Sequence, residues 1–132
     1  MPDNDDQLIK AAKKVREQAH APYSGFLVGA ALQDEHGNVY LGCNVENASF
    51  PEGNCAETSA IGAMVAAGGR KIDTIAVVGG HTQLEDCTPC GGCRQRIREF
   101  ADDNTRIIAL DASGEFVEYS IEDLLPKSFQ LK

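Results

Sequence analysis

The first third of the chain passes from a helical pattern to a strand pattern. Apolar residues recur every three or four positions across residues 6–20, which predicts an amphipathic helix. Two apolar runs, at 26–33 and 39–45, flank a polar turn at 34–38 that contains a glycine. This arrangement predicts two strands joined as a β-hairpin. The helical repeat consists of Leu8, Ala12, Val15 and Ala19.

The rest of the chain alternates between helical and strand patterns. The predicted elements are, in order, a helix with N-cap Asn54 that ends at 68–69, a strand at 72–78, a helix at 91–101, strands at 106–110 and 116–119, and a helix at 121–125 stopped by Pro126. Strands that alternate with helices predict an α/β fold with βαβ crossovers and helices packed on a sheet. Because no repeat or Pro/Gly/Ser-rich linker divides the chain, residues 1–132 are expected to form one domain.

Composition and charge narrow the classes of function. Hydrophobic residues make up 42% of the chain and charged residues 24%, which is typical of a globular protein. The 12 basic and 20 acidic residues give a net charge of −8, which disfavours binding to a nucleic acid polymer. The N-terminus has no signal-peptide pattern, and the longest apolar stretch, 60–69, is too short to span a membrane. We therefore expect a cytoplasmic protein with no membrane partner.

Five cysteines cannot all form disulfides within one chain, and cytoplasmic thiols stay reduced. Clustered cysteines in that compartment favour metal binding or catalysis. Two segments are candidates for such a site. One is Cys55-Ala56-Glu57, and the other is the run from Pro89 to Arg94, with the sequence Pro-Cys-Gly-Gly-Cys-Arg. Each begins a predicted helix that follows a strand. In βαβ units such helix starts lie at the carboxyl edge of the sheet, so the two segments are expected to converge there.

The spacing of these cysteines is typical of a catalytic zinc site. Cys90 and Cys93 lie on one helical turn and provide two thiolates, and Cys55 provides a third. Three protein ligands leave one tetrahedral position for water, whose pKa zinc lowers toward ~7. Glu57 is placed to reach that water without binding the metal, which is the position of a proton shuttle.

Other readings of the cysteines stay open at this point. Cys90 and Cys93 alone could form a thioredoxin-like redox pair, but Cys55 and Glu57 have no role in it. Cys87 could replace Cys93 as a ligand, although Pro89 and the helix start favour Cys93. Four thiolates including Cys87 would form a closed structural zinc site that leaves Glu57 without a function. Cys43 is predicted to be a small core residue.

Charge adds a constraint on the metal site. Zinc with three thiolates carries about −1, which opposes ionisation of bound water. Two helix N-termini, each equivalent to roughly +0.5 charge, offset part of it. Arg94, next to Cys93, is predicted to contribute further charge compensation.

The combination of Cys-x-Glu and Pro-Cys-x-x-Cys matches the zinc nucleobase deaminase signature in a three-cysteine form. Three further segments, 23–32 (YSGFLVGAAL), 42–48 (GCNVENA) and 124–129 (LLPKSF), extend the match. Together they resemble the small homotetrameric cytidine deaminases from about Leu8 to Phe129. The resemblance implies a three-layer α/β/α fold with a mixed sheet of about five strands and helices on both faces. It also implies one Zn²⁺ per chain.

The resemblance implies hydrolysis of cytidine and deoxycytidine to uridine and deoxyuridine in pyrimidine salvage. Zinc-activated water attacks C4, and Glu57 carries the proton to N3 and then to the departing ammonia. One position departs from the family: the residue after the Glu of Cys-Ala-Glu is commonly an arginine that hydrogen-bonds the thiolates, and here it is Thr58. The implied substrate contacts are the ribose-binding Asn44 and Glu46, Phe26 beside the nucleoside, the backbone of Ala56 at the pyrimidine, and Phe50 and Phe129, which cross subunit interfaces.

Two other functions remain as alternatives. A deaminase of the same superfamily acting on another aminopyrimidine, such as a nucleoside antibiotic, would share the zinc site. A zinc-stabilised binding module without catalysis would be indifferent to loss of Glu57. The helix after residue 54 adds an expectation of its own, because small residues occur on more than one of its sides. We expect this helix to lie at a subunit contact near a symmetry axis.

Overall fold

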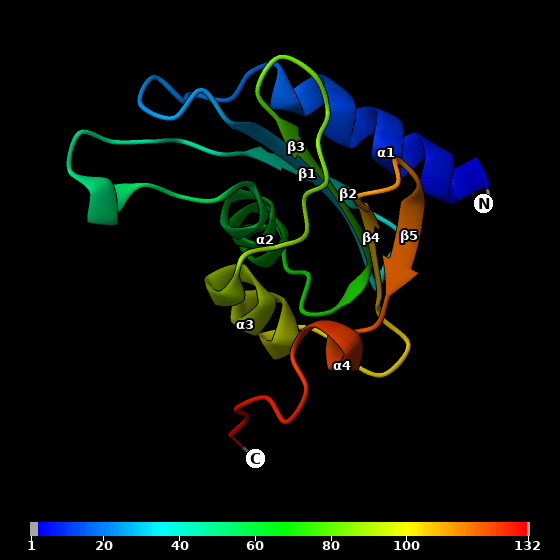
Figure 1. Ribbon diagram of the computed structural model, residues 1–132. Helices are drawn as coiled ribbons and strands as arrows, with labels where there is room; N and C mark the ends of the chain where they lie inside the picture. Colours follow the sequence, from blue (N-terminus) through cyan, green and yellow to red (C-terminus); the bar gives the residue numbers. More distant parts are fainter. Residues whose placement is uncertain (1–2, 132) are drawn as a thin grey trace.

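The computed structural model describes residues 3–131, which form one five-stranded sheet with helices against it (Figure 1). The predicted domain limits, residues 1 and 132, lie outside the described part. The elements are α1 (Asp3–Arg16), β1 (Leu27–Asp34), β2 (Val39–Cys43), the 3₁₀ turn η1 (Phe50–Glu52), α2 (Ala56–Ala66), β3 (Ile72–Gly80), α3 (Gly91–Glu99), β4 (Arg106–Leu110), β5 (Phe116–Tyr119) and α4 (Ile121–Leu124).

The strand order in the sheet is β2-β1-β3-β4-β5. The predicted hairpin is confirmed, because β1 pairs antiparallel with β2 from Gly29↔Cys43 to Gln33↔Val39. On its other side β1 pairs antiparallel with β3, and β3 pairs parallel with β4 across the crossover through α3. The sheet is therefore mixed, as expected. Since β2 and β3 both run antiparallel to β1, they point in the same direction and end at the same edge.

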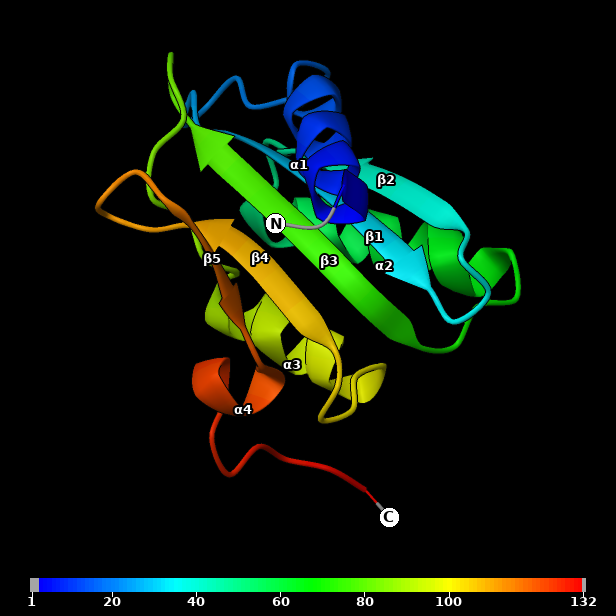
Figure 2. The ribbon, with the colours of Figure 1, turned by 90° about the vertical axis from the view of Figure 1, so that its right-hand side faces the viewer.

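Helices cover both faces of the sheet, which confirms the three-layer prediction. Figure 2 shows α1 crossing one face, with α2 and α3 behind the sheet. The core between α1 and the sheet consists of Leu8, Ile9, Ala12, Ala31, Ala76, Val78 and Ile108. A larger core on the opposite face contains Leu32, Met64, Ile75, Val77, Ile97 and Ile107, together with residues of α4. No helix within residues 3–131 is long and apolar enough to cross a membrane.

Several predicted helix boundaries differ from the structure: α2 ends at Ala66 instead of 68–69, α3 at Glu99 instead of 101, and α4 at Leu124 instead of 125. The first helix starts at Asp3 and ends at Arg16 instead of spanning 6–20, because His20 pairs with Val45 in extended conformation. The second helix has Cys55 as its N-cap, one residue after the predicted Asn54. Asn54 exchanges two backbone hydrogen bonds with Val45, which holds it in a strand-like bridge and moves the helix start onto Cys55.

Gly42 lets the first turn of α2 pack directly on β2. A Cβ atom at this position would lie 2.3 Å from the carbonyl oxygen of Ala56 and 2.5 Å from the backbone nitrogen of Ala60. Any side chain here would therefore push α2 away from the sheet, and glycine is required for the close approach. The contact positions the start of α2, and with it Cys55 and Glu57, relative to the carboxyl edge of the sheet.

Candidate active site

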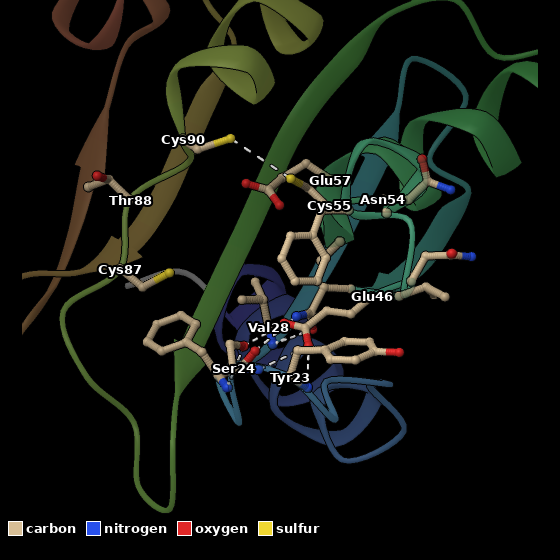
Figure 3. Close-up of a pocket in the computed structure, with 17 residues that line it drawn as sticks. Tyr23, Ser24, Val28, Glu46, Asn54, Cys55, Glu57, Cys87, Thr88 and Cys90 are labelled. Atoms are coloured by element: carbon tan, nitrogen blue, oxygen red, sulfur yellow. Dashed lines mark hydrogen bonds between the residues drawn. The ribbon is translucent and has the colours of Figure 1, made fainter.

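Three cysteine sulfurs meet where α2 and α3 begin. Sγ atoms of Cys55, Cys90 and Cys93 lie within 4.8 Å of one another. Cys55 and Cys90 are 35 residues apart in sequence, yet their Sγ atoms are 3.8 Å apart (Figure 3). Zinc with Zn–S bonds of about 2.3 Å in a tetrahedral site requires sulfurs about 3.8 Å apart. The described geometry therefore fits the predicted zinc ligands, and Cys87 lies outside this cluster.

The charges of the cluster also fit a divalent cation. A hydrogen bond with Cys93 lowers the pKa of Cys55, and the same bond together with burial raises the pKa of Cys93. The opposite shifts of the two pKa values mean that Cys55 loses its proton more readily than Cys93 does. Because zinc binds thiolates, its binding releases such protons and replaces them with two positive charges. Cys55 and Cys90 are the N-cap residues of α2 and α3, so the positive N-terminal ends of both helices lie next to the sulfur cluster.

Glu57 lies beside the sulfur cluster in the first turn of α2 and is only 3% exposed. Burial is the main cause that raises the pKa of its carboxyl, since the charged form is poorly solvated there. Its backbone amide, Cys93 and Arg96 act in the opposite direction. A carboxyl group with a raised pKa at a cavity wall is suited to take up a proton and release it again.

Arg94 does not contact the sulfurs in the structure. Its guanidinium donates to the carbonyl oxygens of Pro89 and Leu124 and to Oγ1 of Thr88, at 2.8 to 3.0 Å. Arg94 thus ties the start of α3 to α4, and its predicted charge compensation stays a prediction. The guanidinium that contacts a sulfur belongs to Arg96, three residues after Cys93. We did not expect this contact, although the i, i+3 spacing on a helix was visible in the sequence.

A cavity of about 680 Å³ opens in front of the cysteines. Figure 3 shows Cys55, Cys90 and Glu57 at one end, and Tyr23, Ser24 and Glu46 at the other. Five of the six predicted substrate-binding residues line it, and sequence reasoning had missed the other wall residues. The predicted set comprises Phe26, Asn44, Glu46, Phe50 and Ala56, and the additional residues include Tyr23, Ser24, Asn54, Cys87 and Thr88.

Asn44 and Glu46 are held in place by the backbone around them. The Asn44 amide accepts from Val28 N and donates to Phe26 O, at 2.8 and 2.9 Å. The Glu46 carboxylate accepts from Ser24 Oγ and from the backbone nitrogens of Tyr23 and Ser24. The hydroxyl of Ser24 is the main cause that lowers the pKa of Glu46, which is therefore ionised at neutral pH.

The aromatic residues of the site occupy different positions. The ring of Phe26 packs edge-on against His81 at a centroid distance of 5.1 Å, and Tyr23 packs against Phe50 at 5.7 Å. Phe129 does not line the cavity of its own chain. It is 69% exposed, and its carbonyl oxygen accepts a hydrogen bond from Gln95 on the outer side of α3.

Cys87 is a half-buried residue of the cavity wall. Burial raises the pKa of its thiol to about 11, so it stays protonated at neutral pH. Nothing in its spacing distinguished it from a metal ligand, because Cys87 and Cys90 have the same i, i+3 relation as Cys90 and Cys93. The difference lies in the fold: Cys87 precedes α3, whereas Cys93 lies on its first turn.

Comparison with known proteins gives matches along most of the chain. Residues 2–109 match the model of a family described as "Cytidine and deoxycytidylate deaminase zinc-binding region". The chain is 41% identical over 124 residues to the cytidine deaminase of Sporosarcina psychrophila, covering 94% of this chain and 90% of that protein. It is 40% identical over 122 residues to the cytidine deaminase of Halalkalibacterium halodurans, covering 92% and 91%.

Solved structures show the same similarity in three dimensions. The crystal structure of cytidine deaminase from Burkholderia pseudomallei matches with a TM-score of 0.84 and 44% identity, covering 94% of this chain and 98% of that one. Cytidine deaminase from Mycobacterium tuberculosis matches with a TM-score of 0.82 and 36% identity, covering 96% and 97%. The matched family range includes α2 and α3, the helices that carry the three cysteines.

Proposed function

This chain belongs to the zinc-binding family of cytidine and deoxycytidylate deaminases, and we propose that it hydrolyses free cytidine and deoxycytidine to uridine or deoxyuridine and ammonia. The observation that carries this proposal is the arrangement of the cavity. The cluster of three cysteine sulfurs, at distances that suit zinc, and the buried carboxyl of Glu57 lie at one end. Polar groups suited to a sugar lie at the other end. The product would return to the uridine pool, which is pyrimidine salvage. We also propose a cytoplasmic location, because thiolate ligands need a reducing compartment.

The zinc ion is proposed to be held by Cys55, Cys90 and Cys93, one ion per chain. When bound, zinc makes a water molecule nucleophilic near neutral pH. Glu57 is the proton carrier of the proposed reaction. It accepts a proton from the attacking water, delivers it to N3 of the pyrimidine, and later passes a proton to the departing amine. The backbone of Ala56, fully buried beside Glu57, is proposed to hold the pyrimidine edge.

Asn44 and Glu46 are proposed to bind the ribose hydroxyls with the capacity that their protein contacts leave free. A carboxylate offers about four acceptor positions, and Glu46 uses three of them on Tyr23 and Ser24. The Asn44 amide has two acceptor and two donor positions and uses one of each. The remaining positions suit a sugar hydroxyl, which both donates and accepts. Phe26 is proposed to pack beside the nucleoside.

The walls of the cavity favour nucleosides over nucleotides. Among the described residues that line it, two are carboxylates, Glu46 and Glu57, and none is lysine or arginine. A phosphate group in such a cavity would face negative charge with no lysine or arginine among these lining residues to compensate it. The proposed substrates are therefore unphosphorylated.

The proposal predicts ammonia release from cytidine and deoxycytidine, with kcat/KM at least about a hundredfold lower for their 5′-monophosphates. The reason is the cost of bringing an unpaired phosphate next to a carboxylate, about 3 kcal/mol or more. The measurement is ammonia release from both nucleosides, both monophosphates and a set of modified aminopyrimidine nucleosides, with zinc quantified in the same preparation.

The two alternatives have distinct outcomes in that assay. Turnover of a modified nucleoside with none of cytidine would favour the other aminopyrimidine deaminase. One zinc per chain with no ammonia from any compound would favour the binding module. Equal rates for nucleosides and monophosphates would contradict the assignment of substrate class.

We further propose a homotetramer in which neighbouring chains complete each other's cavities. Phe50 and Phe129 are 72% and 69% exposed, although aromatic side chains are usually buried in a protein interface or core. On α2, the outer face consists of small exposed residues that permit a second helix to approach closely: Gly62, Ala63, Ala66 and Ala67. These features support a contact between copies at α2 and a role for Phe129 in a neighbour's cavity.

Phe129→Ala is expected to raise KM roughly three- to tenfold with kcat almost unchanged, because an aromatic contact contributes about 0.5–1.5 kcal/mol. A sharper test measures KM after this variant is mixed with Glu57→Gln protomers. The Glu57→Gln protomers lack the proton carrier but retain Phe129. Mixed assemblies should recover the original KM at sites where an active chain meets an intact Phe129. If KM is the same in mixed and unmixed samples, Phe129 does not act across subunits.

A further inference from the structure

Cys93 is the most buried of the three sulfur ligands, and two side chains contact it. Its residue is fully buried, whereas Cys90 is exposed. Oγ1 of Thr58, from α2, lies 3.9 Å from Cys93 Sγ. Nη1 of Arg96, from α3, donates to the same sulfur at 3.8 Å. Apart from Cys55 and Glu57, the buried sulfur of Cys93 therefore has one neutral partner, Thr58, and one cationic partner, Arg96.

Gly92 provides the space that Arg96 needs for this contact. Arg96 follows Gly92 by four residues, so the two share one face of α3. A Cβ atom at Gly92 would lie 3.0 Å from Arg96 Nη1 and 3.9 Å from Cζ. The guanidinium of Arg96 thus lies over Gly92, which has no side chain. It extends toward the N-terminus of α3 to contact Cys93, which is the direction that helical side chains favour.

The site needs positive charge that α2 does not supply. Three thiolates outweigh the charge of zinc, and the residue after Glu57 is the uncharged Thr58. We propose that Arg96 is a positioning residue that supplies this charge from α3, orienting the Cys93 thiolate and strengthening its bond to zinc. A guanidinium–thiolate contact is charge-assisted, and here it is partly buried because the exposed Arg96 reaches the buried sulfur of Cys93. The inference rests on the proposed zinc-dependent function for the presence of the metal.

Arg96→Ala is expected to weaken zinc binding roughly ten- to a hundredfold, the range found for residues that orient metal ligands. The measurement is zinc competition with a chromogenic chelator. Cobalt-substituted protein gives a second readout, a changed thiolate-to-cobalt absorption band. Because Arg96 is exposed, its loss leaves the core intact, which far-UV circular dichroism checks. Gly92→Ala displaces the guanidinium without removing it and should weaken binding in the same direction.

Two further variants make the test specific. Arg98→Ala removes the same charge from the same helix, but its guanidinium contacts Ala101 O and Gln130 Oε1, so zinc affinity should not change. The double variant Thr58→Arg with Arg96→Ala places an arginine on α2 beside Cys93. It should recover most of the zinc affinity that Arg96→Ala loses.

The outcomes separate this inference from the proposed function. If the unmodified protein binds no zinc, the proposed function fails. If it binds zinc and Arg96→Ala binds it as tightly as Arg98→Ala does, Arg96 has no part in the metal site. Weakened binding that Thr58→Arg does not recover would also overturn the inference, since charge at Cys93 would then not be what Arg96 provides.

Discussion

Glu57→Gln is expected to lower kcat by roughly 10³- to 10⁴-fold while one zinc remains bound per chain. Removal of a general acid–base typically costs up to that factor, and here one carboxyl is proposed to act in each proton transfer. The amide has the same shape but does not exchange protons at neutral pH. The measurement combines steady-state kinetics on cytidine with metal analysis of the same sample.

The melting temperature separates loss of chemistry from loss of structure in this variant. Glu57 is 3% exposed and carries a charge that is costly to bury, so a neutral amide should leave the melting temperature unchanged or raise it. Glu17→Gln serves as the control, because it replaces a glutamate by glutamine at an exposed position, and it should keep full activity. If Glu57→Gln retained more than a tenth of kcat, another group would have to carry the protons.

Cys90→Ala is expected to abolish both zinc binding and deamination. The two remaining sulfurs, those of Cys55 and Cys93, provide only two protein ligands, one from the start of each helix, so they form a weak site. Cys90 is exposed, and its removal leaves no cavity in the core. Cys43→Ala is the matched control, because Cys43 lies outside the sulfur cluster on β2.

Loss of zinc should also lower thermal stability, because the three sulfurs converge in the folded chain, which therefore binds the ion more tightly than the unfolded chain does. At a zinc concentration 1,000 times its Kd, binding contributes about 4 kcal/mol to the free energy of unfolding. For a domain of this size, that is on the order of 10 °C in Tm. A chelator should therefore lower the Tm of the unmodified protein and leave the Tm of Cys90→Ala unchanged. An equal chelator effect on both would show that the ion binds elsewhere.

The types of the elements were predictable from local patterns, but several boundaries were not. The strand at 106–110 and the hairpin follow from their own apolar residues. The start of α2 depends on a remote contact, the bridge between Asn54 and Val45, which a helical pattern does not contain. The strand order has the same origin, since the pairing of β1 with β3 joins residues that are far apart in sequence, from Asp34↔Ile72 to Leu27↔Gly80.

The three proposed metal-binding cysteines were singled out by two local patterns: Cys90 and Cys93 are three residues apart, and Cys55 precedes Glu57 by two residues. Arg96 was missed because its contact requires a bare helical turn at Gly92 and a side chain that folds back toward Cys93. Arg94 was singled out by adjacency to Cys93. On a helix, however, adjacent residues point in different directions, so Arg96 reaches the sulfur and Arg94 reaches α4.

The position of β1 in the sheet separates the two strands that lead to the three cysteines. β1 contributes no sulfur, yet it lies between β2 and β3, whose following helices carry all three. Neighbouring strands are about 4.8 Å apart, so β2 and β3 are separated by roughly 9.6 Å. That separation falls within the 8–10 Å at which two helix axes pack, so α2 and α3 can lie side by side on the same face of the sheet. The inserted strand therefore acts as a spacer between the two helix starts that bring the three cysteine sulfurs together.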